Sequence, residues 1–222
     1  MNNLISLTKT AKISLQKQNL IGINAKVVLV LDISKSMNPL YKNGTVQKTI
    51  ERLLALAINF DSEKQIDAYV FGTEAHQLNA ITEQDINNYV TREITAKHKI
   101  NQATYYAKAV ELIQANYYGK RNLPVFVIFI TDGDATDKTA TKAWLQQISK
   151  EPIFWQFIGI GKEQFTFLES LESLSGRTIN NAAFLKIDNL DTIPESELYD
   201  NLLKKYPNWL TLMRQKKIIS NG

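Results

Sequence analysis

Short apolar segments alternate along the chain with longer amphipathic ones. Each short segment is rich in β-branched and aromatic residues and is flanked by turn-forming residues, a pattern that predicts β-strands. The segments 27–31 and 125–130 are apolar at every position, which is typical of strands buried on both faces of a parallel sheet. The predicted strands cover residues 26–32, 65–72, 124–132, 153–161 and 182–188.

The longer segments place their apolar residues at helical spacing. Residues 45–60 show this most clearly, because Val46, Ile50, Leu53 and Ala57 recur at intervals of three and four. The N-terminal segment 4–20 could alternate as a strand in its second half, but its leucines favour a helix. The predicted helices after this segment cover residues 45–60, 104–118, 136–150, 163–174 and 194–206, with a short one at 82–90.

The alternation of strands and helices predicts a doubly wound α/β fold, with a mostly parallel sheet flanked by helices. Residues 73–80 are too few for a helix, and we expect them to add one antiparallel edge strand. The expected organisation is an N-terminal arm at 1–24 packed on a domain at 25–210, followed by a basic tail at 211–222.

Composition narrows the chemistry that this fold could carry. The 222 residues include no cysteine, which excludes disulfides and thiolate zinc sites. With only two histidines, the chain also has too few for a histidine-rich metal site. Any metal would have oxygen ligands, which favours Mg²⁺, Ca²⁺ or Mn²⁺. The mild net charge of +4 is spread along the chain and does not favour nucleic-acid binding. We expect a cytoplasmic protein, because the N-terminus is too polar for a secretory signal and no segment is apolar for the length of a membrane span.

Oxygen-bearing side chains gather at the ends of two predicted strands. Asp32 ends the first strand and is followed by Ser34 and Ser36, while Asp132 ends the strand that begins at residue 124. In a doubly wound sheet, ligands bind outside the carboxyl ends of the strands, where the strand order reverses. If these two strands are neighbours, the two carboxylates meet and repel unless a cation lies between them. The sequence therefore predicts a divalent cation site, to which Thr104 at the start of a helix could add an oxygen.

These residues resemble a known motif. Asp32-x-Ser34-x-Ser36, followed by Thr104 and by Asp132 in a Thr-Asp-Gly sequence, is similar to the metal-ion-dependent adhesion site (MIDAS) of von Willebrand factor type A (vWA) domains. Several further segments are similar to the bacterial TerF-like, tellurium-resistance branch of that superfamily. They are 40–61, 70–78, 127–138, 151–161 and 197–210.

The resemblance implies a binding function without catalysis. In such domains serine and threonine hydroxyls contact the metal, here expected to be Mg²⁺, while the aspartates often act through water. One coordination position stays open for an aspartate or glutamate of a protein partner. The resemblance also implies a role in tellurite or stress resistance, with another protein of such a system as the partner. One departure concerns Thr104, because relatives usually carry Gly-Gly before this threonine and the chain has Gln102-Ala103.

Two alternative functions remain open from the sequence. A magnesium-dependent phosphohydrolase could also use Asp32 and Asp132, although Ser34 stands where such enzymes carry a second aspartate. A scaffold with a vestigial site is the other alternative. Nearby, Asp134 and Asp137 are expected to serve a turn and the N-cap of the following helix rather than the metal.

Overall fold

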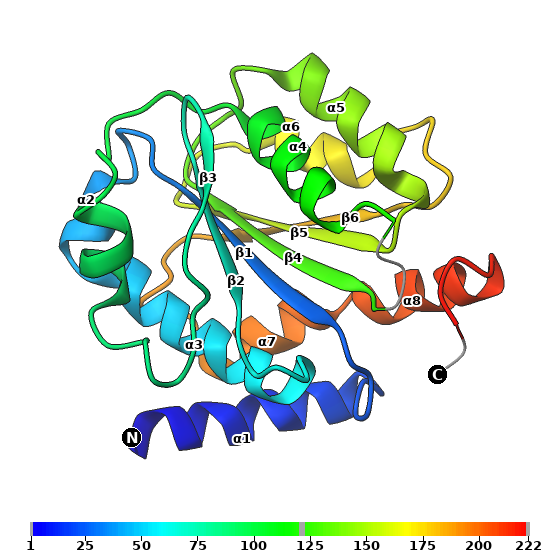
Figure 1. Ribbon diagram of the computed structural model, residues 1–222, viewed down its shortest axis with the longest axis horizontal. Helices are drawn as coiled ribbons and strands as arrows, with labels where there is room; N and C mark the ends of the chain where they lie inside the picture. The colour runs from blue at the N-terminus through cyan, green and yellow to red at the C-terminus, as the bar shows by residue number, and fades with distance from the viewer. Residues whose placement is uncertain (1, 120–122, 221–222) are drawn as a thin grey trace.

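A single mixed sheet forms the centre of the molecule (Figure 1). The computed structural model describes residues 2–119 and 123–220, and within them six strands pair in the order β3-β2-β1-β4-β5-β6. All neighbouring pairs are parallel except β2 with β3, which confirms the α/β fold class and the antiparallel edge strand. The strands are β1 (Lys26–Asp32), β2 (Asp67–Phe71), β3 (Ala75–Gln77), β4 (Val125–Thr131), β5 (Ile153–Ile160) and β6 (Ala182–Ile187).

Helices cover both faces of the sheet, so that its strands are buried on both sides. On one face, α3, α7 and α8 cover the side of the sheet that carries Val27 and Leu29 of β1, with α1 packed on α3 and α7 (Figure 1). On the other face, α4, α5 and α6 cover the side that carries Val28 and Val30 (Figure 1). This two-sided burial explains the unbroken apolar runs of the central strands. The helices are α1 (Asn2–Lys17), α2 (Asn38–Lys42), α3 (Thr45–Phe60), the π-helix η1 (Val90–Thr95), α4 (Tyr106–Tyr117), α5 (Lys138–Gln147), the 3-10 helix η2 (Ile148–Lys150), α6 (Thr166–Glu172), α7 (Glu195–Leu203) and α8 (Tyr206–Gln215).

The N-terminal segment is a helix, α1, that packs along α3 and α7. Leu7, Ala11 and Leu15 recur at a spacing of four and are buried in the core, with exposed fractions of 5% or less. This apolar stripe explains why the segment forms a helix rather than a strand. Residue 1 of the expected N-terminal arm lies outside the described residues.

Two expectations about helices need correction. The short helix predicted over 82–90 does not form, because residues 82–88 are turns and irregular backbone, and a π-helix begins only at Val90. The helix predicted over 194–206 ends at Leu203, and a second helix, α8, begins at Tyr206. Pro207 suits the first turn of this second helix. The expected start of the basic tail at residue 211 therefore falls inside α8, and residues 221 and 222 of that tail lie outside the described residues.

The strand order reverses between β1 and β4. The chain passes from β1 to its neighbour β2 and the edge strand β3, and then returns to the opposite side of β1 as β4. Leu31 of β1 lies beside Ile130 of β4, so the two strands end together at the same edge of the sheet. This edge is the place where doubly wound folds bind ligands.

Candidate metal site

The carboxylate of Asp32 lies at the end of β1 and is fully buried. Its Oδ1 accepts a hydrogen bond from the backbone N–H of Ser34 at 2.6 Å, and its Oδ2 accepts one from the Thr131 hydroxyl at 2.6 Å. The hydroxyl of Tyr41 donates to the backbone carbonyl of Asp32 at 2.9 Å. The side chain and the backbone of Asp32 are therefore held from β4, from the following turn and from α2.

Thr131 is part of this arrangement, although the sequence interpretation did not single it out. It is the last residue of β4, is fully buried, and receives a hydrogen bond from the N–H of Gly133 at 3.2 Å. The hydroxyl of Tyr106 donates to the Gly133 carbonyl at 2.6 Å and so holds the turn that follows. The signal was present in the sequence as a hydroxyl residue directly before Asp132.

The two serine hydroxyls connect the β1 turn to Asp132. Ser34 Oγ lies 3.1 Å from Ser36 Oγ, and Ser36 Oγ donates to Asp132 Oδ1 at 2.7 Å. Ser34 is buried, Ser36 is exposed and Asp132 is half-buried, so this set of oxygens runs from the interior toward the surface. The structure thus brings Asp32, Ser34, Ser36 and Asp132 together, with an exposed outer side.

Thr104 lies in a loop that contacts both strand ends. Its backbone carbonyl accepts a hydrogen bond from the N–H of Thr136 at 2.9 Å, and its side chain is half-buried rather than in the core. Within the described part of the chain, no hydrogen bond joins the Thr104 hydroxyl to the other four predicted ligands. The loop of Thr104 lies at the site, but its hydroxyl forms no hydrogen bond with the Asp32, Ser34, Ser36 and Asp132 side chains.

Gln102 fixes this loop. Its backbone pairs with the β1 turn, because its N–H donates to the Ile33 carbonyl and its carbonyl accepts from the N–H of Lys35, each at 3.3 Å. Its side-chain Oε1 accepts from the N–H of Thr73 at 3.0 Å. A Cβ added to Gly72 would lie 2.6 Å from the Cβ of Gln102. The glycine at position 72 therefore provides the space that the larger residue needs.

The aspartates after Asp132 have structural roles. Asp137 stands at the N-cap position of α5, but its two carboxylate oxygens accept hydrogen bonds from the N–H groups of Tyr106 and Ala107 at 2.9 and 2.8 Å. It therefore caps α4 rather than its own helix. Asp134 accepts from the N–H of Ala135 and pairs with Lys138 on the surface. Both contacts of Asp134 are local to the segment between β4 and α5.

Burial changes the acid–base behaviour of both carboxylates. Burial raises the pKa of Asp32 to about 6, although the bonds from Thr131 and Ser34 oppose this shift and the charge of Asp132 adds to it. Burial also raises the pKa of Asp132, against the opposing bond from Ser36. A divalent cation between the carboxylates would stabilise their charged forms. The oxygen set fits a hard cation such as Mg²⁺. Across residues 2–119 and 123–220, no three acidic or histidine side chains gather, so the hydroxyls would complete the ligand set.

Comparisons with known proteins place the chain among relatives. Residues 24–219 match the family model vWA-TerF-like, described as "vWA found in TerF C terminus". The chain is 40% identical over 215 residues to the protein "Uncharacterized protein YcbR" of Bacillus subtilis (strain 168), and the alignment covers 95% of this chain and 88% of that protein.

Solved structures of vWA proteins share the fold at low sequence identity. A von Willebrand factor type A protein from Catenulispora acidiphila superposes with a TM-score of 0.62 at 15% identity, over 82% of this chain and 42% of that one. The SpRpn10 VWA domain gives a TM-score of 0.58 at 12% identity, over 82% and 95% of the two chains. Proximal thread matrix protein 1 from the mussel byssus, with a zinc-occupied MIDAS motif, gives 0.54 at 17% identity, over 85% and 48%.

Proposed function

The chain belongs to the TerF-like family of vWA domains, and on that premise we propose that it is a metal-ion-dependent protein-binding module rather than an enzyme. The proposed metal ligands are Asp32, Ser34, Ser36, Thr104 and Asp132, with Mg²⁺ as the metal and Ca²⁺ or Mn²⁺ as possible substitutes. The partner would be a protein that contributes an aspartate or glutamate side chain.

The linkage of Ser34, Ser36 and Asp132 is the observation that carries this proposal. These three side chains form one hydrogen-bonded series that starts beside the buried Asp32 and includes the exposed Ser36. Neutral hydroxyls donate little charge to a metal, so a cation held mainly by them remains strongly electrophilic. When bound there, it would offer a coordination position to a carboxylate oxygen from outside the protein.

The geometry of Asp32 supports binding over catalysis. A phosphohydrolase that used this aspartate as its nucleophile would need an accessible carboxylate oxygen. Asp32 is fully buried, and its two oxygens each accept a hydrogen bond from the protein at 2.6 Å. This carboxylate is placed to hold a site together and to balance the charge of a cation.

The proposal extends to a cellular setting. Because the matched family model is named after TerF, we propose a role in tellurite or stress resistance. The proposed partner is another protein of such a system, and the proposed compartment is the cytoplasm. The described helices include none with the length and apolar character that crossing a membrane would require. Cell fractionation and growth of a deletion strain on tellurite would test this setting.

Calorimetric titration with Mg²⁺, Ca²⁺, Mn²⁺ and Zn²⁺ tests the site itself. Zinc belongs in the series because a structural neighbour carries it in its MIDAS motif. We expect the intact chain to bind at least one of these ions, and Ser36→Ala to bind it roughly tenfold more weakly. Ser62→Ala is the matched control, because Ser62 is exposed and far along the chain from these residues. No heat of binding and no rise in melting temperature with any ion would favour a scaffold with a vestigial site.

A pull-down from native lysate, run with Mg²⁺ and again with a chelator, tests the binding role. The proposal expects one or more proteins to be retained with the metal and lost with the chelator, and to be lost from Ser36→Ala in both conditions. Proteins that are retained equally with Mg²⁺ and with chelator, and equally by the intact chain and Ser36→Ala, would contradict a metal-dependent interaction.

A further inference from the structure

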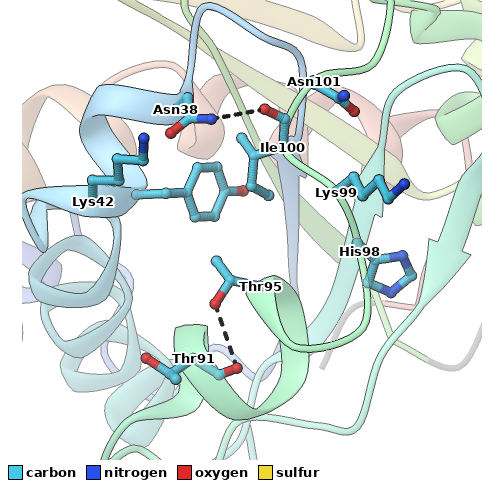
Figure 2. Close-up of a pocket in the computed structure, with 9 residues that line it drawn as sticks. Asn38, Lys42, Thr91, Thr95, His98, Lys99, Ile100 and Asn101 are labelled. Carbon is cyan, nitrogen blue, oxygen red and sulfur yellow. Dashed lines mark hydrogen bonds between the residues drawn. The ribbon is translucent and has the colours of Figure 1, made fainter.

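A cavity of about 560 Å³ lies between α2, the π-helix η1 and the segment 98–101 (Figure 2). Its volume falls within the range of ligand pockets in proteins. Five of the residues that line it are exposed, so the cavity is open to solvent rather than enclosed. The lining residues are Asn38, Tyr41, Lys42, Thr91, Thr95, His98, Lys99, Ile100 and Asn101.

The cavity shares its walls with the candidate metal site. The hydroxyl of Tyr41 donates to the carbonyl of Asp32 at 2.9 Å, and Asn38 Nδ2 donates to the carbonyl of Ile100 at 3.1 Å (Figure 2). Two residues after Ile100, the backbone of Gln102 pairs with Ser34. The segments 32–42 and 98–104 therefore build both the cavity and the candidate metal site.

The charge of the cavity is positive and unbalanced. Lys42 lies on α2 and Lys99 on the facing segment, and no aspartate or glutamate is among the lining residues. Within the described ranges, neither lysine forms an ion pair. His98 adds little charge, because burial and the nearby His76 and Lys97 lower its pKa. Two cations without acidic neighbours favour an anionic ligand.

The backbone at the cavity is also unusual. Residues Val90–Thr95 form a π-helix, a rare conformation that is found often at functional sites. Thr91 and Thr95 lie on the turn of η1 that faces the cavity, and both are exposed (Figure 2). The hydroxyl of Thr95 donates to the backbone carbonyl of Thr91, and the Asn101 side chain adds a further polar group to the cavity wall (Figure 2).

We propose that this cavity binds a second carboxylate of the partner, so that the partner presents an acidic segment rather than a single acidic residue. This inference rests on the proposed function, because the first carboxylate is the one expected at the metal site. Small ligands are usually enclosed over most of their surface, which this open cavity does not allow. An extended acidic segment therefore fits the open, positively charged cavity better than a small molecule does. Lys42 and Lys99 lie on opposite walls of the cavity, so each would attract an acidic side chain that follows or precedes the metal-binding one (Figure 2).

Fluorescence anisotropy with a labelled hexaglutamate peptide tests the proposal. The intact chain is measured with Mg²⁺ and with a chelator at low ionic strength, because salt screens exposed charges. We expect Lys42→Gln/Lys99→Gln to bind the peptide roughly tenfold more weakly, since each exposed charge pair contributes up to about 1 kcal/mol. The matched control is Lys9→Gln/Lys12→Gln on α1, which removes the same charge from exposed positions and should change affinity less than about twofold.

The outcomes separate the cavity from the metal site. The inference is overturned if the cavity variant, Lys42→Gln/Lys99→Gln, binds the peptide as tightly as the intact chain does. It is also overturned if the intact chain binds no peptide, even where calorimetry shows that the chain binds Mg²⁺. Weaker binding by the cavity variant, with no effect of chelator or of Ser36→Ala, supports the acidic-segment site and counts against the proposed metal-dependent function. Tighter binding of inorganic phosphate than of hexaglutamate, with the same dependence on the two lysines, overturns the assignment to an acidic segment.

Discussion

Thr131, at the end of β4, donates a hydrogen bond of 2.6 Å to the buried carboxylate of Asp32, at the end of β1. The bond joins two strands whose sequence positions are 99 residues apart, and it lies at the point where the strand order reverses. It fixes one carboxylate oxygen of Asp32 while Ser34 fixes the other. The inner part of the candidate site is thus organised by protein hydrogen bonds.

Replacing Thr131 by valine should destabilise the protein. The substitution keeps the shape of the side chain but leaves Asp32 Oδ2 buried without its donor, and an unsatisfied buried polar group costs about 1–3 kcal/mol. Chemical denaturation of metal-free Thr131→Val should show this loss as a lower midpoint at an unchanged slope. Thr139→Val, at an exposed position of α5, is the control and should lie within about 0.5 kcal/mol of the parent. A fully stable Thr131→Val would show that the bond contributes nothing.

The stability of the metal-free protein should fall as pH rises through the pKa of Asp32. Burial raises this pKa from 3.8 to about 6 in the folded protein, so between these values the folded state keeps a proton that the unfolded state has released. The free energy of unfolding therefore decreases across this pH range, by about 3 kcal/mol in total, and levels off above it. Asp132, whose pKa is also raised by burial, adds a change of the same sign.

Asp32→Asn isolates this contribution, because the amide does not titrate. Denaturation midpoints of the parent and the variant, measured without metal at a series of pH values, should diverge between pH 4 and 6, with the parent losing stability relative to the variant as pH rises. Saturating Mg²⁺ should flatten the parent's dependence, since a cation stabilises the charged carboxylates. Parallel pH profiles for the two proteins would contradict the assignment of the raised pKa to Asp32.

Asp137→Ala should destabilise the start of α4. The carboxylate of Asp137 accepts hydrogen bonds from the N–H groups of Tyr106 and Ala107, so its removal leaves two helix-terminal donors without their acceptor. Loss of a cap typically costs about 1 kcal/mol. Asp134→Ala is the comparison, because Asp134 is exposed and forms only a surface pair and a turn contact, and it should cost less than about 0.5 kcal/mol. Thermal unfolding of both variants measures the difference.

Much of the fold followed from local pattern. The apolar run that ends at Asp32 predicted β1 with its observed bounds, because a carboxylate marks where a doubly buried strand must stop. The meeting of the two strand ends followed from topology, since parallel neighbours end at one edge, and the pairing of β1 with β4 confirms that they are neighbours. These features depend on burial and on chain order, which a sequence carries directly.

The remaining features depend on contacts between distant segments. Asp137 looks like the cap of α5, and only the packing of the β4 turn against α4 explains why it caps Tyr106 and Ala107 instead. A short helix was expected over residues 82–90, but the chain forms the π-helix η1 from Val90 instead. The π-helical conformation is set by the surrounding packing rather than by residue preference. The role of Thr131 was hidden because alternation within a wholly buried strand does not tell which face points to a site.

The contact between Gly72 and Gln102 leads to a prediction about metal binding. A Cβ at position 72 would lie 2.5 Å from Gln102 Oε1 and 2.6 Å from Gln102 Cβ, so Gly72→Ala must displace the backbone of the loop that carries Thr104. We expect this variant to lose about 1–3 kcal/mol of stability, because overpacking strains the surrounding structure. Metal affinity should fall roughly tenfold, because the groups that orient ligands would move. Calorimetric titration and chemical denaturation measure the two effects.

The double variant Gly72→Ala/Gln102→Gly tests whether the contact between residues 72 and 102 causes the loss of stability in Gly72→Ala. Removing the glutamine side chain frees the space that the new methyl group needs, so the double variant should recover most of the stability lost by Gly72→Ala. Recovery of metal affinity should be smaller, because the bond from Thr73 N–H to Gln102 is lost and glycine gives the loop more freedom. The single variant Gln102→Gly completes the comparison. Additive losses of stability in the double variant would place the effect of Gly72→Ala elsewhere. Unchanged metal affinity in Gly72→Ala, Gln102→Gly and the double variant would remove the 102–104 loop from the site.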